Sequence, residues 1–430
     1  MTALAAGLLA PDGILPGRDQ VLDADALGHF LSARLGAGGD RVPIERCELV
    51  RAHYRFGRSL RVLHRIRVRD QWRWISGRVF KDARAEKAFR RAGSPTTVRG
   101  GLREVVYDAD QGAVFWTFPS DRSLVDLVAL LAETRALARR LSGPQATARI
   151  IGYRPEHSLV LRIVDSSGQA VSYVKIYRNG GREAALRHDV LTRQVPATDP
   201  HLRVPAAIAR AADGRIVVFE AIDGRRLGEL DETAIEAGIA RHGAALATFH
   251  TLAPPPGVPR FARVDPDQLA KSAAMLARAC PNGAPEAAAL AEELGRCDPP
   301  SPDAPVCLHG DVHLHNGILT GDRVALIDFD KLALGPPVVD LGSFLSLLHY
   351  QTAVGILSVS AAARREAAIL RGYGSVRPLP EASVLRWHTA AALLAEQAVR
   401  AVRRVRPEAL GQLPRLLAEA RRVLKGNGNA

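Results

Sequence analysis

Residues 308–316 read LHGDVHLHN and hold three histidines, one aspartate and one asparagine. Asn316 follows Asp311 by five residues, and a short hairpin-like stretch then leads to Asp328. A loop carboxylate can orient and deprotonate an attacking hydroxyl, while an asparagine and a second aspartate supply the hard oxygen ligands that Mg²⁺ prefers. This order and spacing favour phosphoryl transfer from a nucleotide.

Such chemistry also needs a cation that steadies the nucleotide phosphates. Lys175 lies in the β-like run VKIY, and Glu183 follows it by eight residues at the start of a helical segment. A strand lysine that is anchored by a helical glutamate performs this task in protein kinases. We therefore expect Lys175 and Glu183 to form a pair beside the phosphates.

Two stretches of the first half resemble one another, YRFGRSL at 54–60 and YRPEHSL at 153–159. Each is followed by two β-like runs, a helical segment and a hairpin-like pair of strands. The common order predicts two copies of one α+β unit. Arg78 stands in the first copy where Lys175 stands in the second. Arginine does not replace lysine at a fitted phosphate site, so we interpret the first copy as degenerate.

From about residue 231 the pattern changes to helix. Helical segments are predicted at 232–252, 285–296 and 383–405. Strand-like exceptions occur near 306–308, 317–319 and 323–327, where they bracket the residues of the opening motif.

The combined motifs resemble those of the aminoglycoside phosphotransferase/choline kinase superfamily, the small-molecule relatives of protein kinases. The resemblance rests on the HGD-x-H-x-x-N pattern at 309–316, on IDFD at 327–330 and on GPPVVDLG at 335–342. It covers residues from about 146 to 405 and implies an enzyme, a small-molecule kinase that uses ATP and Mg²⁺, with GTP as the alternative donor.

The resemblance also implies roles for individual residues. Asp311 would be the catalytic base, and Asn316 and Asp328 would bind the metal. Asp340 matches a position that supports the catalytic loop, and Asp330 is a further candidate for the metal shell.

Nucleotide contacts are implied on the strand side. Lys175 and Glu183 match the family's lysine–glutamate pair. The segment FEAI at 219–222 matches the interlobe hinge, where Glu220 and Ile222 would present backbone groups to the adenine. Ser158 can offer a hydroxyl or a backbone N–H to a phosphate. The loop 154–158 lacks the glycine that usually lets the backbone approach phosphates, which is the feature that favours a non-catalytic binding protein instead.

A zinc site is an alternative for the histidines, because His-x-His is a known ligand spacing. The HGD-x-H-x-x-N pattern accounts for two of the three without zinc. We expect His309 to be a structural hydrogen-bonding residue.

Charge narrows the class of partner. The 430 residues carry a formal net charge of +13, and only 5% are aromatic. No zinc-finger, RRM or KH signature accompanies the charge, so nucleic acid is not the expected partner, although a nucleic-acid or anionic-surface binder is the remaining alternative. The basic residues after 345 argue against a polycationic aminoglycoside, because like charges repel. A neutral or anionic hydroxyl compound, such as a sugar derivative, fits better.

The expected fold class is α+β, a protein-kinase-like bilobal fold with an antiparallel-sheet N-lobe, a mainly helical C-lobe and a degenerate duplicate N-lobe at the N-terminus. The expected domains are a helical lead-in (1–40), the degenerate repeat (41–140), the nucleotide lobe (146–227) and the catalytic and substrate lobe (228–430). No run is apolar enough to cross a membrane, so a cytoplasmic protein is expected. The extra repeat is a candidate homodimer interface.

Overall fold

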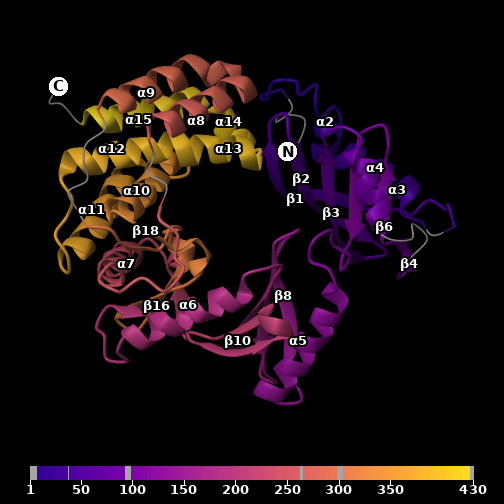
Figure 1. Ribbon diagram of the computed structural model, residues 1–430, viewed down its shortest axis with the longest axis horizontal. Coiled ribbons are helices and arrows are strands. Elements are labelled where there is room, and N and C mark those ends of the chain that lie inside the picture. Colours follow the sequence, from indigo (N-terminus) through magenta and orange to yellow (C-terminus); the bar gives the residue numbers. More distant parts are fainter. Residues whose placement is uncertain (1–6, 37, 93–97, 262–264, 298–303, 427–430) are drawn as a thin grey trace.

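The computed structural model describes all residues except 1–6, 37, 93–97, 262–264, 298–303 and 427–430. The first six residues of the predicted lead-in and the last four of the predicted C-lobe lie outside the described part. Three blocks make up the chain: two antiparallel five-stranded sheets and one helical lobe (Figure 1).

The first block contains the N-terminal repeat. Its elements are α2 (Arg18–Leu22), α3 (Ala24–Arg34), β1 (Arg46–Arg55), β2 (Ser59–Val68), β3 (Gln71–Phe80), α4 (Arg84–Arg91), β4 (Val98–Arg99), β5 (Leu102–Arg103), β6 (Val105–Asp108) and β7 (Ala113–Thr117). The Asp23 side chain caps α3 by accepting hydrogen bonds from the backbone N–H groups of Asp25 and Ala26. Within the predicted lead-in, the helices α2 and α3 pack on β1, β2 and β3, whereas residues 7–17 form turns and irregular structure.

The second block contains the second repeat and the helix that precedes it. Its elements are α5 (Leu127–Ser142), β8 (Thr147–Arg154), β9 (Ser158–Val164), β10 (Ala170–Tyr177), α6 (Gly181–Gln194), β12 (Ala207–Ala211) and β13 (Ile216–Glu220). Helix α5 packs against β8 and β10, so it covers the second sheet rather than the first.

The two sheets have the same strand order. The first runs β1-β2-β3-β7-β6, and the second runs β8-β9-β10-β13-β12. In each sheet, a connection that contains a helix leads from the third strand to a hairpin, which is β6–β7 in the first sheet and β12–β13 in the second. The second strand of that hairpin pairs with the third strand of the sheet, β3 or β10. Arg78 of β3 lies opposite Val114 of β7, just as Lys175 of β10 lies opposite Val217 of β13. The predicted duplication is confirmed.

The helical lobe follows. Its helices are α7 (Ile235–Phe249), α8 (Pro266–Ala279), α9 (Ala284–Arg296), α10 (Val338–Ala353), α11 (Val359–Gly374), α12 (Ala382–Ala392), α13 (Val399–Arg404), α14 (Pro407–Gly411) and α15 (Leu413–Lys425). A π-helical turn (Leu393–Ala398) joins α12 to α13, so the predicted helix at 383–405 is one continuous run.

Small sheets lie at the base of this lobe. They are built from β11 (Leu202–Arg203), β14 (Arg225–Arg226), β15 (Val306–Leu308), β16 (Gly317–Thr320), β17 (Arg323–Leu326) and β18 (Ala333–Gly335). The three strand-like runs predicted around the opening motif are thus β15, β16 and β17. Strand β15 pairs with β18 and β16 pairs with β17, which brings the two halves of the motif together.

The N-terminal repeat contacts both other blocks (Figure 1). One apolar core joins its strands β1–β3 to helices α8, α9, α12 and α15. A second core joins its far side to the second sheet, where Trp74 stacks on Tyr153 with ring centroids 5.4 Å apart. The segment that follows α6 in turn meets the helical lobe through the parallel pair β11 and β17. Each block therefore touches the other two.

No helix among the described residues is long and apolar enough to cross a membrane.

Candidate active site

One buried carboxylate, that of Asp340, fixes the backbone of the loop after β15 through hydrogen bonds. Asp340, in the first turn of α10, accepts hydrogen bonds from the backbone N–H of His309 at 2.7 Å and of Gly310 at 2.9 Å. Its Oδ2 also lies 3.1 Å from Nε2 of His250, whose other ring nitrogen lies 2.9 Å from the Tyr373 hydroxyl. Burial alone would raise the pKa of Asp340, but His250 and these hydrogen bonds lower it. Asp340 thus supports the loop rather than the chemistry.

His309 is a structural residue of this loop. Its Nε2 lies 3.0 Å from the Ile327 carbonyl oxygen, and its Nδ1 accepts from the Asp311 N–H at 3.3 Å. This pattern requires the neutral Nε2–H tautomer, and burial correspondingly lowers the pKa of His309. The rings of His313 and His315 lie 6.0 Å apart. Within the described part of the chain, no three His, Cys, Asp or Glu side chains gather as a metal site.

Asp311 lies beside two residues of the motif. Lys331 Nζ donates to Asp311 Oδ1 at 2.8 Å, and Asn316 Nδ2 donates to the Asp311 carbonyl oxygen at 3.0 Å. Burial would raise the pKa of Asp311, but the charge and hydrogen bond of Lys331 lower it overall. Asp311 is therefore ionised at neutral pH.

Lys175 reaches across to the other end of the motif. Its ammonium donates to Asp328 Oδ1 at 2.8 Å and to Asp330 Oδ2 at 2.6 Å. Burial would lower the pKa of Lys175, but these two carboxylates raise it. Asp328 has a left-handed backbone with φ of 67°, an unfavourable conformation for a residue with a side chain, and it turns the carboxylate toward the lobe interface.

The structure does not bring Glu183 to Lys175. Glu183 is exposed in the first turn of α6, off the buried face that carries Ala184, Ala185 and His188. His188 takes the inward position instead, where its ring packs 4.4 Å from Phe219 and 5.0 Å from Phe329. The predicted lysine–glutamate pair is absent, and Asp328 and Asp330 neutralise Lys175 in its place.

The other predicted nucleotide contacts fall into two groups. Glu220 and Ile222 line a cavity of about 230 Å³ between the second sheet and the motif, together with Lys175, Asn316 and Asp328. The Ile222 N–H donates to no backbone carbonyl of the described residues, so it can bind a ligand. Ser158 is buried at the start of β9, opposite Tyr177, and does not line this cavity.

Glu220 has a structural task as well. Its carboxylate accepts from the Ala206 N–H at 3.0 Å and from Arg203 at 3.2 Å. These bonds fix the strand end where the chain passes from one lobe to the other.

Five arginines form a cluster in which burial and then the charges of other members lower the pKa values of two of them, Arg51 and Arg404. Its members are Arg51 of β1, Arg154 of β8, and Arg400, Arg404 and Arg406 in and beside α13. Arg404 reaches solvent, yet burial by neighbouring protein and then the charges of other cluster members lower its pKa to about 10. The charge of Asp311 acts on Arg404 in the opposite direction and favours its charged form.

Sequence reasoning missed three of these residues. Lys331 directly follows IDFD, a position that could have drawn attention to it. Arg51 and Arg154 gave no signal, because only the packing of the repeats brings them near α13.

A comparison with protein-family models matches residues 152–379, more than half of the chain, to the model described as the phosphotransferase enzyme family, APH. The chain belongs to this family. The match spans the second repeat and most of the helical lobe, and the N-terminal repeat lies outside it. Family membership and the sheet-plus-helix arrangement give the chain the bilobal α+β kinase-like fold.

Solved structures of phosphotransferases are also similar to this chain. Aminoglycoside phosphotransferase APH(4)-Ia matches with a TM-score of 0.49 and 12% identity over 70% of this chain and 100% of its own. ADP-bound APH(2'')-Ib matches with a TM-score of 0.45 and 15% identity over 69% and 99%. APH(3'')-Id from Streptomyces rimosus matches with a TM-score of 0.43 and 20% identity over 63% and 99%. Among curated proteins, none matches the chain.

Proposed function

We propose that the chain transfers the γ-phosphate of ATP, or of GTP, to a hydroxyl group of a small molecule. The observation that carries this proposal is the convergence of Asp311, Asn316 and Asp328 at the lobe interface. Asn316 donates to the Asp311 carbonyl at 3.0 Å, and Lys175 of the nucleotide lobe holds Asp328 at 2.8 Å. Membership of a phosphotransferase family supports the same chemistry.

Asp311 is the proposed base. Because its pKa is lowered, it stays ionised and accepts a hydrogen bond from the acceptor hydroxyl, which orients the attacking oxygen. Catalysis of phosphoryl transfer depends mainly on positioning and charge stabilisation, so a weakly basic carboxylate suffices. Asp340 fixes the backbone on which Asp311 is mounted.

Asn316 and Asp328 fit a divalent cation by their chemistry. Asn316 uses Nδ2 on the Asp311 carbonyl, so its Oδ1 remains for a metal, and Asp328 supplies a carboxylate. Bound Mg²⁺ would neutralise negative charge on the phosphate oxygens. Lys175 would exchange part of its contact with Asp328 and Asp330 for those phosphates, and the backbone groups of Glu220 and Ile222 would meet the base.

The acceptor is proposed to be an anionic or neutral hydroxyl compound rather than a polycationic aminoglycoside. The arginine cluster, which is linked electrostatically to Asp311 through Arg404, supports this choice, because guanidinium groups attract carboxylate or phosphate and repel ammonium groups. Glu396 lies in the π-helical turn before α13, and it is already engaged by Ser343 at 2.9 Å and Arg400 at 3.6 Å.

The test is Mg²⁺-dependent phosphotransfer from radiolabelled ATP and GTP to a panel of sugar acids, sugar phosphates, neutral sugars and aminoglycosides. We expect turnover with an anionic or neutral member, and a loss of about 10³-fold or more in Asp311→Asn. Asp322→Asn, an exposed aspartate on the neighbouring hairpin, is the matched control and should retain activity. Undiminished turnover in Asp311→Asn would contradict the base assignment, and a preference for aminoglycosides would contradict the acceptor class.

A further inference from the structure

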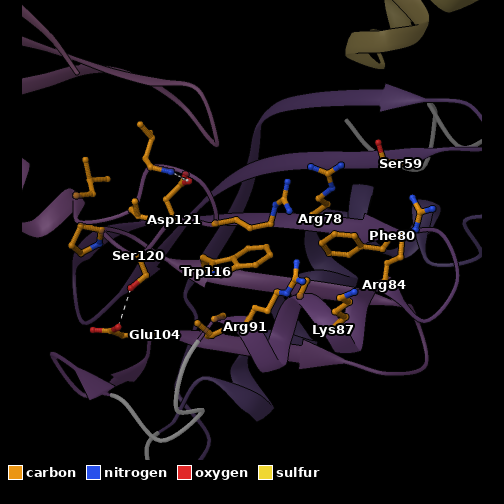
Figure 2. A pocket seen from close by; sticks show the side chains of 18 of the residues that line it. Ser59, Arg78, Phe80, Arg84, Lys87, Arg91, Glu104, Trp116, Ser120 and Asp121 are labelled. Carbon is orange, nitrogen blue, oxygen red and sulfur yellow. Dashed lines mark hydrogen bonds between the residues drawn. The ribbon is translucent and has the colours of Figure 1, made fainter. Parts of the chain in front are cut away.

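A second cavity of the described residues lies in the N-terminal repeat, away from the proposed catalytic cleft. It measures about 910 Å³, against about 230 Å³ for the cavity that Lys175 lines. Arg78, Phe80, Trp116 and helix α4 form its walls (Figure 2). The family match does not reach this repeat, and the proposed transfer reaction does not use it.

This cavity occupies the same place in its sheet as the nucleotide cavity does in the second. The registers of β3–β7 and β10–β13 equate Arg78 with Lys175, and Trp116 with Phe219. The Arg78 guanidinium lies 5.1 Å from the Phe80 ring, just as the Lys175 ammonium lies 5.1 Å from the Tyr177 ring. The duplication has therefore kept a pocket with a cation and aromatic walls.

The charge of the cavity indicates its ligand. Among the described residues that line it, eight are Arg or Lys and three are Asp or Glu. Lys81, Arg84 and Lys87 have no acidic partner within 4 Å in the described part of the chain. Figure 2 shows Arg84 and Lys87 on the same wall as Arg91, near the rings of Phe80 and Trp116. Such a concentration of cations in a concave site favours a phosphate-bearing molecule.

Two of the three acids of the lining already accept hydrogen bonds from groups other than these cations. Asp121 already accepts hydrogen bonds from the backbone N–H groups of Ser123 and Leu124, both at 2.7 Å, and from the Tyr153 hydroxyl at 2.6 Å. Glu104 accepts from the Ser120 hydroxyl at 3.0 Å, as Figure 2 also shows.

A carboxylate from the second repeat already binds the wall of this cavity. Glu156 lies in the loop between β8 and β9, the loop that would cover nucleotide phosphates in the catalytic cleft. It accepts from Arg78 at 2.6 Å and from Arg122 at 2.9 and 3.1 Å. Burial would raise the pKa of Glu156, but these arginines lower it, so the side chain remains an anion. Its backbone N–H also donates to Asp121 at 2.9 Å.

We propose that the cavity of the N-terminal repeat is a second binding site, for a small phosphorylated molecule that competes with Glu156 for Arg78 and Arg122. No base or metal-ligand motif follows the first repeat in sequence, so the site binds and does not catalyse. Because Glu156 belongs to the phosphate-covering loop, occupancy frees that loop. Binding at the two cavities is then linked, and by thermodynamic necessity each ligand alters the affinity of the other equally.

The test uses inorganic tripolyphosphate without Mg²⁺, titrated calorimetrically into the full chain. Arg84→Gln/Lys87→Gln removes two exposed charges of the cavity wall, and we expect it to weaken binding by about tenfold or more. Arg135→Gln/Arg139→Gln removes two exposed charges from α5 and is the matched control; it should bind as the unaltered chain does. Lys175→Met should also retain binding, which separates this site from the catalytic cleft whether or not the proposed transfer reaction holds. Unchanged binding in the first variant, loss in Lys175→Met, or no binding at all would overturn the site.

The competition has its own readout. In the Lys175→Met background, tripolyphosphate should increase hydrogen exchange at the Glu156 amide, and Arg84→Gln/Lys87→Gln should abolish the increase. Glu156→Gln should bind tripolyphosphate several-fold more tightly, because the competing anion is gone. Binding that leaves both exchange and the Glu156→Gln affinity unchanged would overturn the competition.

Discussion

Lys331 Nζ lies 2.8 Å from Asp311 Oδ1, so the proposed base is paired with a cation that follows the second proposed metal ligand by three residues. The pair ties the catalytic loop to the IDFD segment. It also sets the protonation state of Asp311, because the lysine overrides the effect of burial on the pKa of that carboxyl.

Lys331→Met should raise the pKa of Asp311. With the cation gone, burial becomes the dominant influence on the carboxyl, so the acid limb of the kcat/KM profile should move to higher pH. We expect activity at pH 6 to fall by about tenfold or more, with partial recovery in Lys331→Arg. The measurement is the pH profile of phosphotransfer between pH 5 and 9. Lys271→Met, an exposed lysine of α8, is the control, and an unshifted acid limb in Lys331→Met would refute the role.

Lys175→Met should strengthen the binding of a divalent cation in the absence of nucleotide. Lys175 neutralises Asp328 and Asp330, and its removal leaves two adjacent carboxylates without a counter-charge. We expect Mn²⁺, followed by electron paramagnetic resonance, to bind about tenfold more tightly. The double variant Lys175→Met/Asp328→Asn should lose that gain. An affinity that does not change in Lys175→Met would show that Asp328 is not a metal ligand.

Asp340→Asn should destabilise the helical lobe by about 3 kcal/mol, because the amide cannot accept from both backbone N–H groups and loses the charge that faces His250. The pKa of Asp340 is lowered on folding, so its stabilisation is present above the pKa of the unfolded chain and is lost as the pH falls through the folded value. Denaturant unfolding at pH 7 and at a series of pH values from 4 down to 2 measures both effects. The exposed Asp322→Asn should cost about 1 kcal/mol or less, and an equal loss in both variants would contradict the role of Asp340.

Two buried histidines should make the fold sensitive to mild acid. Burial lowers the pKa of His64 and of His242 to about 3. Between pH 6.5 and 5 the unfolded chain binds a proton at each site and the folded chain does not, so each site lowers the unfolding free energy by up to about 2 kcal/mol. His64→Leu should remove its share of this decline, whereas the exposed His29→Leu should not. Urea unfolding at both pH values is the measurement, and identical pH dependence in the two variants would contradict the expectation.

The sequence predicted what is local and missed what depends on packing. Asp311, Asn316 and Asp328 lie within one loop and one hairpin, so their spacing alone indicated that they meet. The shared strand order was visible because each repeat kept its alternating strands and turn residues. The prediction of a lysine–glutamate pair was wrong because of the direction in which α6 turns its side chains. A helix that begins at Gly181 turns its 184, 185, 188 and 191 positions inward, and Glu183 falls outside that face.

Contacts between the repeats had no local signature. Glu156 is an ordinary turn residue in the sequence, with φ of 65° in the structure, and only the packing of the second repeat on the first delivers it to Arg78. Trp74 behaves similarly, since it stacks on Tyr153 of the other repeat as well as contacting Phe118 of its own, and Trp72 is 39% exposed. Only Trp116 among these tryptophans packs in the core of its own repeat.

Because the N-terminal repeat contacts both other blocks, each of the three blocks is held by the other two. In a kinase of two lobes, a single hinge lets the nucleotide cleft open while nothing else moves. Here the helical lobe and the nucleotide lobe are also joined through the repeat, by the apolar core at α8, α9, α12 and α15 on one side and by the Trp74–Tyr153 stack on the other. Widening the cleft therefore obliges at least one of those two contacts to slide or separate. We therefore expect the repeat to restrain the opening of this cleft.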